Sequence, residues 1–376
     1  MLSEYNFRNY NFRLLFSALA LNVIGLLVIN SAVSGDRYYL NRQLIGLFGG
    51  LMIAVVLSLI SYRQVLRFSG AIYVACIAIL LAVILAGQLG GAGAGSRRWI
   101  TLPVIGRFQP SEFVKIGLIL FFSWFLQKNQ ERINQPITII TMGLFAAVPL
   151  FLILDQPDLS TSIVIMVVIV CLIFIAGISY KWILGALAVM IPALSLVIFL
   201  AQMNLLPFLE PYQVKRILAF VNPSKYADLN LQQDNSKMAI GSGQLYGKGL
   251  FNDTAISVKN GNFLSEEHTD FIFSVIGEEL GFLGCMIVLL LFLIFVYECL
   301  RTGAKARDLS GKLLCTGMAA LVGFQTFTNI AVATGVFPNT GLPLPFISYG
   351  VSSLVSLYIG VGILLNVSLQ QAKLEF

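Results

Sequence analysis

The sequence is poor in charged residues. Lys, Arg, Asp and Glu make up 11% of the 376 residues, whereas 57% are hydrophobic. Soluble domains carry about a quarter of charged residues, so this composition excludes a soluble protein. Apolar runs such as residues 44–60 fill whole segments and not just one helix face. This pattern indicates a protein whose solvent is a lipid bilayer.

Histidine is nearly absent, and cysteine is sparse. The chain has one histidine, His268, which excludes a metal site built from several histidines. The five cysteines lie in or beside apolar runs without a Cys-x-x-Cys pair, so no disulfide framework is expected. The net charge of +6 comes from scattered Lys and Arg residues, and we therefore expect no nucleic-acid binding.

Apolar windows that could cross a bilayer recur along the whole chain. A spanning helix needs about 20 apolar residues, and about ten such windows are present. They begin near residues 13, 44, 70, 111, 138, 160, 183, 271, 313 and 348. We therefore predict an all-α polytopic membrane protein with one domain, residues 1–376. A large extracytoplasmic loop, residues 205–270, is expected between the seventh and eighth spans.

Basic residues predict the orientation of these spans. With both termini in the cytoplasm, the cytoplasmic segments hold twelve Lys and Arg residues, and the short outer segments hold six. Positive charge accumulates on the cytoplasmic side of membrane proteins. We therefore predict that both termini are cytoplasmic, so that residues 205–270 and the Gly-rich segment 90–110 face outward.

Four polar clusters lie at the predicted outer boundary, where a charge within a span costs about 2.5 to 3.5 kcal/mol. The first cluster contains two adjacent arginines, whose guanidinium groups match the geometry of phosphate oxygens and could bind them. Alternatively, this cluster is a flexible loop followed by a Glu112–Lys115 ion pair. Pro110 predicts a helix start, and Ser111 is a candidate cap. The members of this cluster are residues 91–95, Arg97, Arg98, Gln109, Ser111, Glu112 and Lys115.

The second cluster is a turn between two spans, residues 155–162. Its carboxylates Asp155 and Asp158 lie three residues apart and could share a metal ion or a sugar hydroxyl. Alternatively, Asp158 caps the sixth span, because the hydroxyl-bearing residues that follow are typical of a helix start.

The third cluster ends the large loop and contains Asp270, at the point where the chain re-enters the membrane. Partial desolvation there would raise the pKa of the carboxyl and suit it to general-base catalysis, although a helix cap needs no chemistry. Glu278 and Glu279 follow closely and suggest a shaped polar pocket. His268 is expected to be structural, because no second type of metal ligand accompanies it.

The fourth cluster, residues 338–350, contains three prolines among glycines and cannot continue a helix. Non-helical backbone at membrane depth is tolerated only against protein or water, so we predict a re-entrant segment that lines a cavity. Gln325 and Asn329, four residues apart on the preceding span, are expected to bond neighbouring helices.

Six segments, in order over essentially the whole chain, resemble the shape, elongation, division and sporulation (SEDS) family of bacteria. The HTD and AIGSG motifs favour its rod-shape, elongation branch. The chain departs from the family pattern at Gln244 and Val351, where the family usually has glycine. The segments are GSRRWI with FQPSEFVK, DQPDLSTS, PYQVKRILAFVNP, SKMAIGSGQLYGKGL, EEHTDFIFSVIGEELGFLG and PNTGLPLPFISYG.

This resemblance implies a peptidoglycan glycosyltransferase that polymerises lipid II at the outer face of the bacterial cytoplasmic membrane. The resemblance also implies a role in cell elongation and cell shape. The implied partners are a class B penicillin-binding protein, the cell-elongation machinery and membrane lipids. The family's catalytic aspartate falls on Asp270. Its other functional positions fall on Arg98, Glu112, Lys115 and Asp158.

The implied reaction inverts the anomeric centre, because it forms a β-1,4 bond from an α-linked lipid diphosphate. One base suffices, and we expect Asp270 to take the proton of the acceptor 4-hydroxyl. Arg98 and Lys115 would stabilise the departing diphosphate, with a divalent cation such as Mg or Mn held by Asp158. Gln109 and Ser111 are further substrate-binding candidates.

Two other classes of function stay open from the sequence. A lipid-linked precursor flippase would also need a membrane cavity with buried charge. A non-catalytic scaffold for the penicillin-binding protein is the other alternative. Within the family, service in division or sporulation is an alternative to elongation.

Overall fold

Long apolar helices dominate the computed structural model, which describes residues 5, 7–33, 35–88, 98–102, 106–203, 214, 218, 226–251 and 266–371. The α-helices are α1 (Phe12–Ala32), α2 (Arg37–Leu59), α3 (Tyr62–Arg67), α4 (Ser69–Gln88), α5 (Pro110–Lys128), α6 (Pro136–Asp155), α7 (Leu159–Ile175), α8 (Tyr180–Gln202), α10 (Ala227–Ser242), α11 (Ile272–Ala304), α12 (Leu309–Ala333) and α13 (Val351–Leu369). Two 3-10 helices, η2 (Phe7–Asn9) and η3 (Gln130–Arg132), and two strands, β1 (Ile100–Leu102) and β2 (Gly106–Phe108), complete the order.

Each of the ten predicted windows overlaps a helix, namely α1, α2, α4 to α8 and α11 to α13. Six of these helices are long and apolar enough to cross a membrane, and three others contain shorter apolar stretches. The prediction of an all-α multi-pass membrane protein is confirmed. The number of ten spans and the single-domain division stay predictions.

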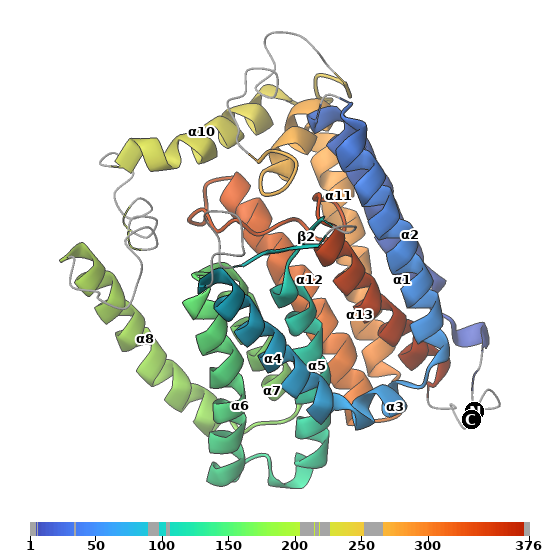
Figure 1. Ribbon diagram of the computed structural model, residues 1–376, viewed down its shortest axis with the longest axis vertical. Coiled ribbons are helices and arrows are strands. Elements are labelled where there is room, and N and C mark those ends of the chain that lie inside the picture. The colour runs from blue at the N-terminus through green and yellow to red at the C-terminus, as the bar shows by residue number, and fades with distance from the viewer. Residues whose placement is uncertain are drawn as a thin grey trace.

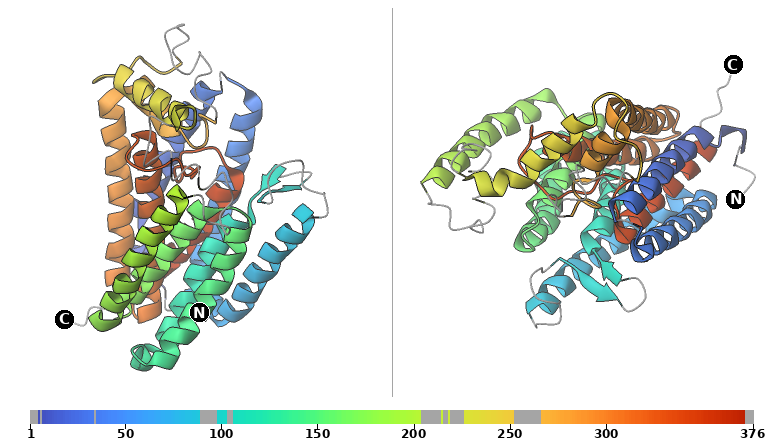
Figure 2. Two further views of the ribbon diagram at one scale, coloured as in Figure 1. Left: turned by 90° about the vertical axis from the view of Figure 1, so that its left-hand side faces the viewer. Right: turned by 90° about the horizontal axis from the view of Figure 1, so that it is seen from above.

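The helices run between two ends of a bundle (Figure 1). At the terminal end, the first and last described segments meet, because the Asn11 backbone N–H donates to Ser368 Oγ at 3.2 Å. At the other end, here called the α10 end, helix α10 crosses the bundle in Figures 1 and 2. Both described chain ends therefore lie at one end of the bundle, as an even number of spans requires.

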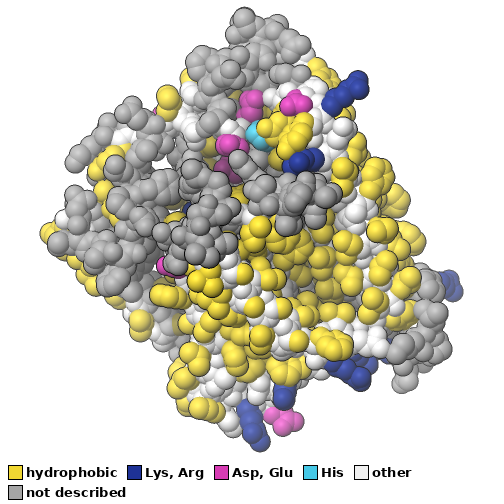
Figure 3. All heavy atoms as spheres, in the orientation of Figure 1, with side chains coloured by type: hydrophobic (Ala, Val, Ile, Leu, Met, Phe, Trp, Pro, Cys, Tyr) yellow, Lys and Arg dark blue, Asp and Glu magenta, His cyan; other side chains and the backbone are white. Residues whose placement is uncertain are grey.

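Charge is distributed unequally between the two ends. Several Lys and Arg side chains gather at the terminal end in Figure 3, whereas the α10 end shows both acidic and basic side chains near the one histidine, His268. Hydrophobic side chains cover much of the flank between them. The cytoplasmic location of the termini stays a prediction that this distribution favours.

Helix α2 shows why hydrophobicity in this chain is not confined to a buried face. Its large side chains Ile45, Phe48 and Met52 are exposed, where lipid would contact them. Its small residues face α13 instead: a Cβ at Gly50 would lie 2.8 Å from the Tyr358 ring. Small residues let helix backbones approach closely in membranes, so the size of the side chain identifies the packed face.

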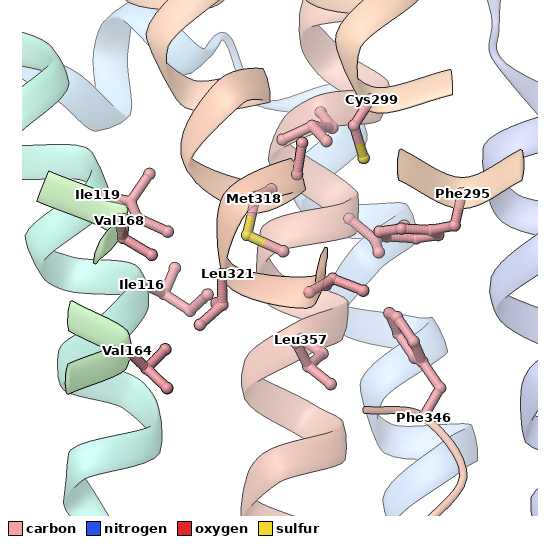
Figure 4. Packing of buried hydrophobic residues seen from close by; sticks show 14 of the residues in the cluster. Ile116, Ile119, Val164, Val168, Phe295, Cys299, Met318, Leu321, Phe346 and Leu357 are labelled. Carbon is pink, nitrogen blue, oxygen red and sulfur yellow. The ribbon is translucent and has the colours of Figure 1, made fainter. Parts of the chain in front are cut away.

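The centre of the bundle lies between α5, α7, α12 and α13 (Figure 4). Met318 and Leu321 of α12 belong to this cluster of buried side chains. Phe346, from the non-helical segment 335–350, enters the same core, with ring centroids 5.1 Å from Phe295 and 5.9 Å from Tyr358. The hydrophobic core therefore holds segment 335–350 in place.

Segment 335–350 has no helix, as its prolines predicted. Leu342, Leu344, Phe346 and Ile347 are all buried. Because non-helical backbone cannot face lipid, the segment lies against protein. The predicted non-helical connection is confirmed.

Two local structures differ from the prediction. The Gly-rich region contains an antiparallel pair of short strands, with Ile100 opposite Phe108. The large loop, residues 205–270, contains helix α10 and a turn structure at 243–251. At Gln244, where the family usually has glycine, the backbone adopts the left-handed φ of 49° that glycine favours.

The turn structure at 243–251 meets α11 where that helix is broken. Gly281 has φ 65° and ψ −164° inside α11. A Cβ at this position would lie 2.3 Å from the Gly247 backbone nitrogen. Only glycine fits, both for its conformation and for the close approach.

Replacement of Gly281 by alanine is expected to destabilise the protein by about 1 to 3 kcal/mol, because it adds both strain and a clash. Thermal unfolding of purified protein in detergent would show a lower midpoint. Gly323→Ala is the matched control, since its new Cβ would meet one side-chain atom at 3.6 Å. An equal midpoint for Gly281→Ala and the wild type would contradict this explanation.

Candidate functional site

The four predicted clusters converge at the α10 end of the bundle. The first and second clusters are joined by Arg98, whose Nε donates to the Gln156 carbonyl at 2.9 Å. Its Nη2 donates to the Pro157 carbonyl. A guanidinium has five N–H groups, so this anchoring leaves donors for a ligand. Arg97 and residues 91–95 lie outside the described residues.

The second cluster is a helix start. Asp158 Oδ1 accepts from the Thr161 backbone N–H at 3.1 Å, and Oδ2 accepts from its hydroxyl at 2.9 Å. The cap interpretation is therefore confirmed for this residue. Asp158 is buried, whereas Asp155 is exposed at the end of α6, so the two carboxylates do not form one site.

The first cluster contains a buried ion pair. Lys115 Nζ lies 2.8 Å from Glu112 Oε1, and both side chains are nearly fully buried. The same ammonium donates to Gln325 Oε1 at 3.1 Å. Within the described residues, Glu112 Oε2 has no hydrogen-bond partner. The predicted pair is confirmed, and its burial makes it costly to keep for stability alone.

The predicted cap at Ser111 is wrong. Helix α5 begins at Pro110, and Gln109 occupies the N-cap position without a side-chain cap bond. Proline suits the first helical position because the missing N–H has no helical partner there, which places the cap one residue before it. The Gln109 backbone N–H donates instead to Ser352 Oγ at 3.2 Å. Ser111 is buried at the first turn of α5.

The loop that carries Asp270 is held by three consecutive carbonyl groups. The His268 carbonyl accepts from the Tyr349 backbone N–H at 2.9 Å. The Thr269 carbonyl accepts from Ser348 Oγ at 2.6 Å, and the Asp270 carbonyl accepts from Asn329 Nδ2 at 2.8 Å. The third and fourth clusters thus form one unit.

Segment 335–350 also approaches the Asp270 carboxylate itself. Gly341 has φ 71°, and a Cβ on it would lie 3.3 Å from Asp270 Oδ2. Ser160 donates from its hydroxyl to the neighbouring Thr340 carbonyl at 2.5 Å. The second cluster therefore reaches the segment that borders the Asp270 carboxylate.

The implied functional positions differ in how accessible they are. Arg98 and Asp270 are half-buried, whereas Lys115 is nearly inaccessible. This geometry favours Arg98 for direct contact with an anion and Lys115 for a fixed positive charge behind it. The assignments of Asp270, Arg98, Lys115, Glu112, Asp158, Gln109 and Ser111 to catalysis or binding stay predictions.

The fit of a divalent cation is poor at Asp158. Both of its oxygens already serve the cap of α7. The part of the chain that the structure describes contains no group of three or more His, Cys, Asp or Glu side chains suited to a metal. Participation of Mg or Mn, which the sequence analysis considered, stays untested, and no step below passes through a metal.

Glu278 and Glu279 stabilise the turn structure at 243–251. Glu278 Oε1 lies 2.6 Å from Lys248 Nζ, and Glu279 Oε1 accepts from Ser31 Oγ at 2.5 Å. The same Ser31 Oγ accepts from the Phe251 backbone N–H at 3.1 Å. These contacts join α11, α1 and the end of the described loop.

The sequence analysis did not predict the contacts of three residues of the site. Ser348 and Gly341 lie in a proline-rich segment whose pairing is invisible locally. Gln43 of α2 accepts from the Gly350 backbone N–H at 3.1 Å and donates to the Ser348 carbonyl at 3.2 Å. A buried glutamine in an apolar helix could have marked this contact, because such residues need partners in a membrane.

His268 is packed among aromatic rings. Its ring centroid lies 4.8 Å from that of Tyr39 and 5.7 Å from that of Tyr349. Burial lowers the pKa of His268 below its ordinary value of 6.5, and the nearby Glu266 opposes this shift. The expected structural role agrees with this environment.

The single histidine makes this pKa directly measurable. NMR of protein labelled at histidine should show a neutral His268 at pH 7, with a titration midpoint below 6.5. Because the folded state resists protonation, local stability falls as the pH drops through 6.5. Glu266→Gln should lower the midpoint further, since it removes the carboxylate that raises the pKa. A midpoint above 6.5 in the wild type would contradict the buried environment.

Sequence comparison finds similarity over nearly the whole chain. The family described as cell cycle protein, named for FtsW, RodA and SpoVE, matches residues 12–373. A protein of Trichlorobacter lovleyi named "Probable peptidoglycan glycosyltransferase FtsW" is 36% identical, over 97% of this chain and 94% of the relative. The Escherichia coli K12 "Peptidoglycan glycosyltransferase MrdB" is 33% identical, over 96% of this chain and 94% of the relative.

Solved structures share the fold. A chain from the structure titled "Structural coordination of polymerization and crosslinking by a peptidoglycan synthase complex" has a TM-score of 0.79 at 28% identity, over 96% of this chain and 97% of that one. The rod shape determining protein RodA of Thermus thermophilus has a TM-score of 0.69 at 27% identity, over 96% of each chain. The chain therefore belongs to the FtsW/RodA/SpoVE family, which is the SEDS family that its motifs resemble.

Proposed function

We propose that the protein is a peptidoglycan glycosyltransferase that polymerises lipid II into glycan strands at the outer face of the bacterial cytoplasmic membrane. The observation that carries this proposal is the placement of Asp270. Its loop is fixed by three carbonyl contacts at the same end of the bundle as Arg98 and the Glu112–Lys115 pair. The relatives named as peptidoglycan glycosyltransferases support the same activity.

The proposed reaction is a single displacement. Asp270 accepts the proton of the acceptor sugar's 4-hydroxyl while that oxygen forms the new bond to the donor's anomeric carbon. The bond from this carbon to the diphosphate breaks, and the diphosphate leaves with its negative charge. Because attack and departure occur on opposite faces, the α-linked donor yields a β-1,4 bond without a covalent nucleophile.

Arg98 is the proposed partner of the departing diphosphate. It is half-buried and already fixed by the carbonyls of Gln156 and Pro157, so its remaining N–H groups are oriented before the substrate arrives. Preorganised donors stabilise charge that develops in a transition state without further reorganisation. Lys115 contributes from within the bundle, as a positive charge that Glu112 and Gln325 hold in place.

The location at a bilayer boundary follows from the amphiphilic substrate. A polyprenyl tail stays in the apolar layer, whereas the sugars and the diphosphate require polar contacts. The α10 end combines the polar site with apolar helices directly below it. We propose a class B penicillin-binding protein and the cell-elongation machinery as partners. The fold shared with a chain of a peptidoglycan synthase complex supports a synthase partner.

The general-base role predicts a severe loss in Asp270→Asn. Polymerisation of labelled lipid II by purified protein with its partner should fall about 100- to 10,000-fold, the usual contribution of general-base catalysis. Asp234→Asn is the matched control, because this carboxylate on α10 is exposed and pairs with Lys237. Glycan chains formed by Asp270→Asn at a near wild-type rate would refute the base assignment.

The same variant separates the proposed activity from the flippase and scaffold alternatives. In proteoliposomes, retained transfer of lipid II across the bilayer with lost polymerisation would show that the two activities are distinct. Support of cell shape by Asp270→Asn protein would favour the scaffold. We expect neither shape support nor polymerisation from this variant.

The Glu112–Lys115 pair predicts a difference between stability and activity. Lys115→Met leaves Glu112 buried without its partner and should cost about 3 to 5 kcal/mol of stability. The double variant Glu112→Gln with Lys115→Met should recover the thermal midpoint but not polymerisation, because the positive charge is still missing. Recovery of both by the double variant would show that the pair serves the fold alone.

A further inference from the structure

Helix α12 presents two buried amide side chains towards the site. Gln325 and Asn329 are four residues apart, which places them on one face of the helix. Their exposed fractions are 0% and 1%. Amides buried this deeply must be hydrogen-bonded to be tolerated, so their partners show what they hold.

Asn329 joins two separate segments of the site. Its Nδ2 donates to the Asp270 carbonyl at 2.8 Å and to the Leu342 carbonyl at 2.7 Å. Both partners are acceptors only, so the nitrogen of the amide must face them. Within the described residues, its Oδ1 has no hydrogen-bond partner. The side chain therefore acts as a double donor.

Gln325 extends the same arrangement by one helical turn. Its Nε2 donates to the Pro343 carbonyl at 2.9 Å, the carbonyl that follows Leu342 in the chain. Its Oε1 accepts from Lys115 Nζ at 3.1 Å. The expectation that these amides bond neighbouring helices thus holds for Lys115 of α5, while their N–H groups bind non-helical backbone.

The two amides complete a continuous path of contacts. It runs from the Glu112–Lys115 pair through Gln325 to segment 335–350, and through Asn329 to the loop of Asp270. Prolines at 343 and 345 remove two backbone donors from this segment, and side-chain amides satisfy the carbonyls of Leu342 and Pro343. Helix α12 is the rigid element common to all of these contacts.

We propose that Asn329 and Gln325 are positioning residues that set the spacing between the Asp270 carboxylate and the Glu112–Lys115 pair. This inference rests on the proposed function, in which Asp270 is the base. Asn329 touches no reacting atom and acts through the backbone of Asp270. A displacement of about 1 Å can reduce a rate 100-fold, so loss of this contact lowers kcat without removing a binding group.

The test is Asn329→Leu, which keeps the number and branching of the side-chain heavy atoms and removes both donated hydrogen bonds. Lipid II polymerisation by the full-length protein with its partner should show kcat reduced about 10- to 100-fold, with KM changed less than about twofold. Thr328→Ala is the matched control. Thr328 is buried on the same turn of α12, and its hydroxyl bonds only the Phe324 carbonyl of its own helix among the described residues.

Measuring the same substitution in an Asp270→Glu protein distinguishes a positioning role of Asn329 from a general effect on stability. Asp270→Glu keeps the carboxylate but displaces it. Adding Asn329→Leu to the Asp270→Glu protein should therefore reduce kcat by a smaller factor than adding it to the wild type. Equal losses in both backgrounds would overturn the proposal, because a purely structural defect is independent of the base. Wild-type kcat for Asn329→Leu would also overturn it.

Different results would refute the positioning role of Asn329 and the proposed function of the protein. Polymerisation by Asp270→Asn at a wild-type rate would refute the base assignment, whatever Asn329 does. An inactive Asp270→Asn protein together with an unaffected Asn329→Leu protein would refute only the positioning role. If Asn329→Leu does not purify in a folded form, Asn329→Ser is the second variant, and the same reduction in kcat at constant KM is expected.

Discussion

The structure depends on one constraint: backbone carbonyls that leave a helix within a membrane bundle must find donors inside the protein. Segment 335–350 supplies only some of them, since its prolines have no N–H and it forms no helix or strand. Gln325 and Asn329 of α12 and Gln43 of α2 supply others from neighbouring helices. One of these donors, Asn329, also holds the Asp270 loop, so the same side chain satisfies the backbone of the segment and fixes the loop.

The two basic side chains of the site, Lys115 and Arg98, are stabilised in different ways. A lysine deep in an apolar bundle needs both an anion and a neutral acceptor, and Glu112 and Gln325 provide them. Arg98 lies nearer the surface, and within the described residues its hydrogen bonds go to carbonyl dipoles and not to a carboxylate. Its charge is therefore only partly compensated, which suits it to an anionic ligand, whereas the charge of Lys115 is largely balanced within the protein.

The sequence alone predicted features that depend on local pattern. Apolar length located the helices, and prolines located the non-helical segment, because both are determined by neighbouring residues. Contacts between distant residues were not predictable: nothing near Asn329 shows that it binds the carbonyl of Asp270, 59 residues away. Ser111 was misplaced because Pro110 fixes the helix start more strongly than a serine does. Glu278 and Glu279 suggested a polar pocket, but their partners Lys248 and Ser31 became visible only in three dimensions.

A rigid loop is consistent with the proposed role of Asp270 as the one base. With the carbonyls of His268, Thr269 and Asp270 each bonded, the backbone of the base is fixed, and only side-chain rotation sets the position of its carboxylate. Gly341 leaves space on one side of that carboxylate, where any side chain would come within contact distance. An inverting transfer asks its base only to receive a proton at the correct place, so accuracy of position matters more than the number of catalytic groups. In the positioning role proposed above, the buried amides of α12 would provide that accuracy through the backbone of the Asp270 loop.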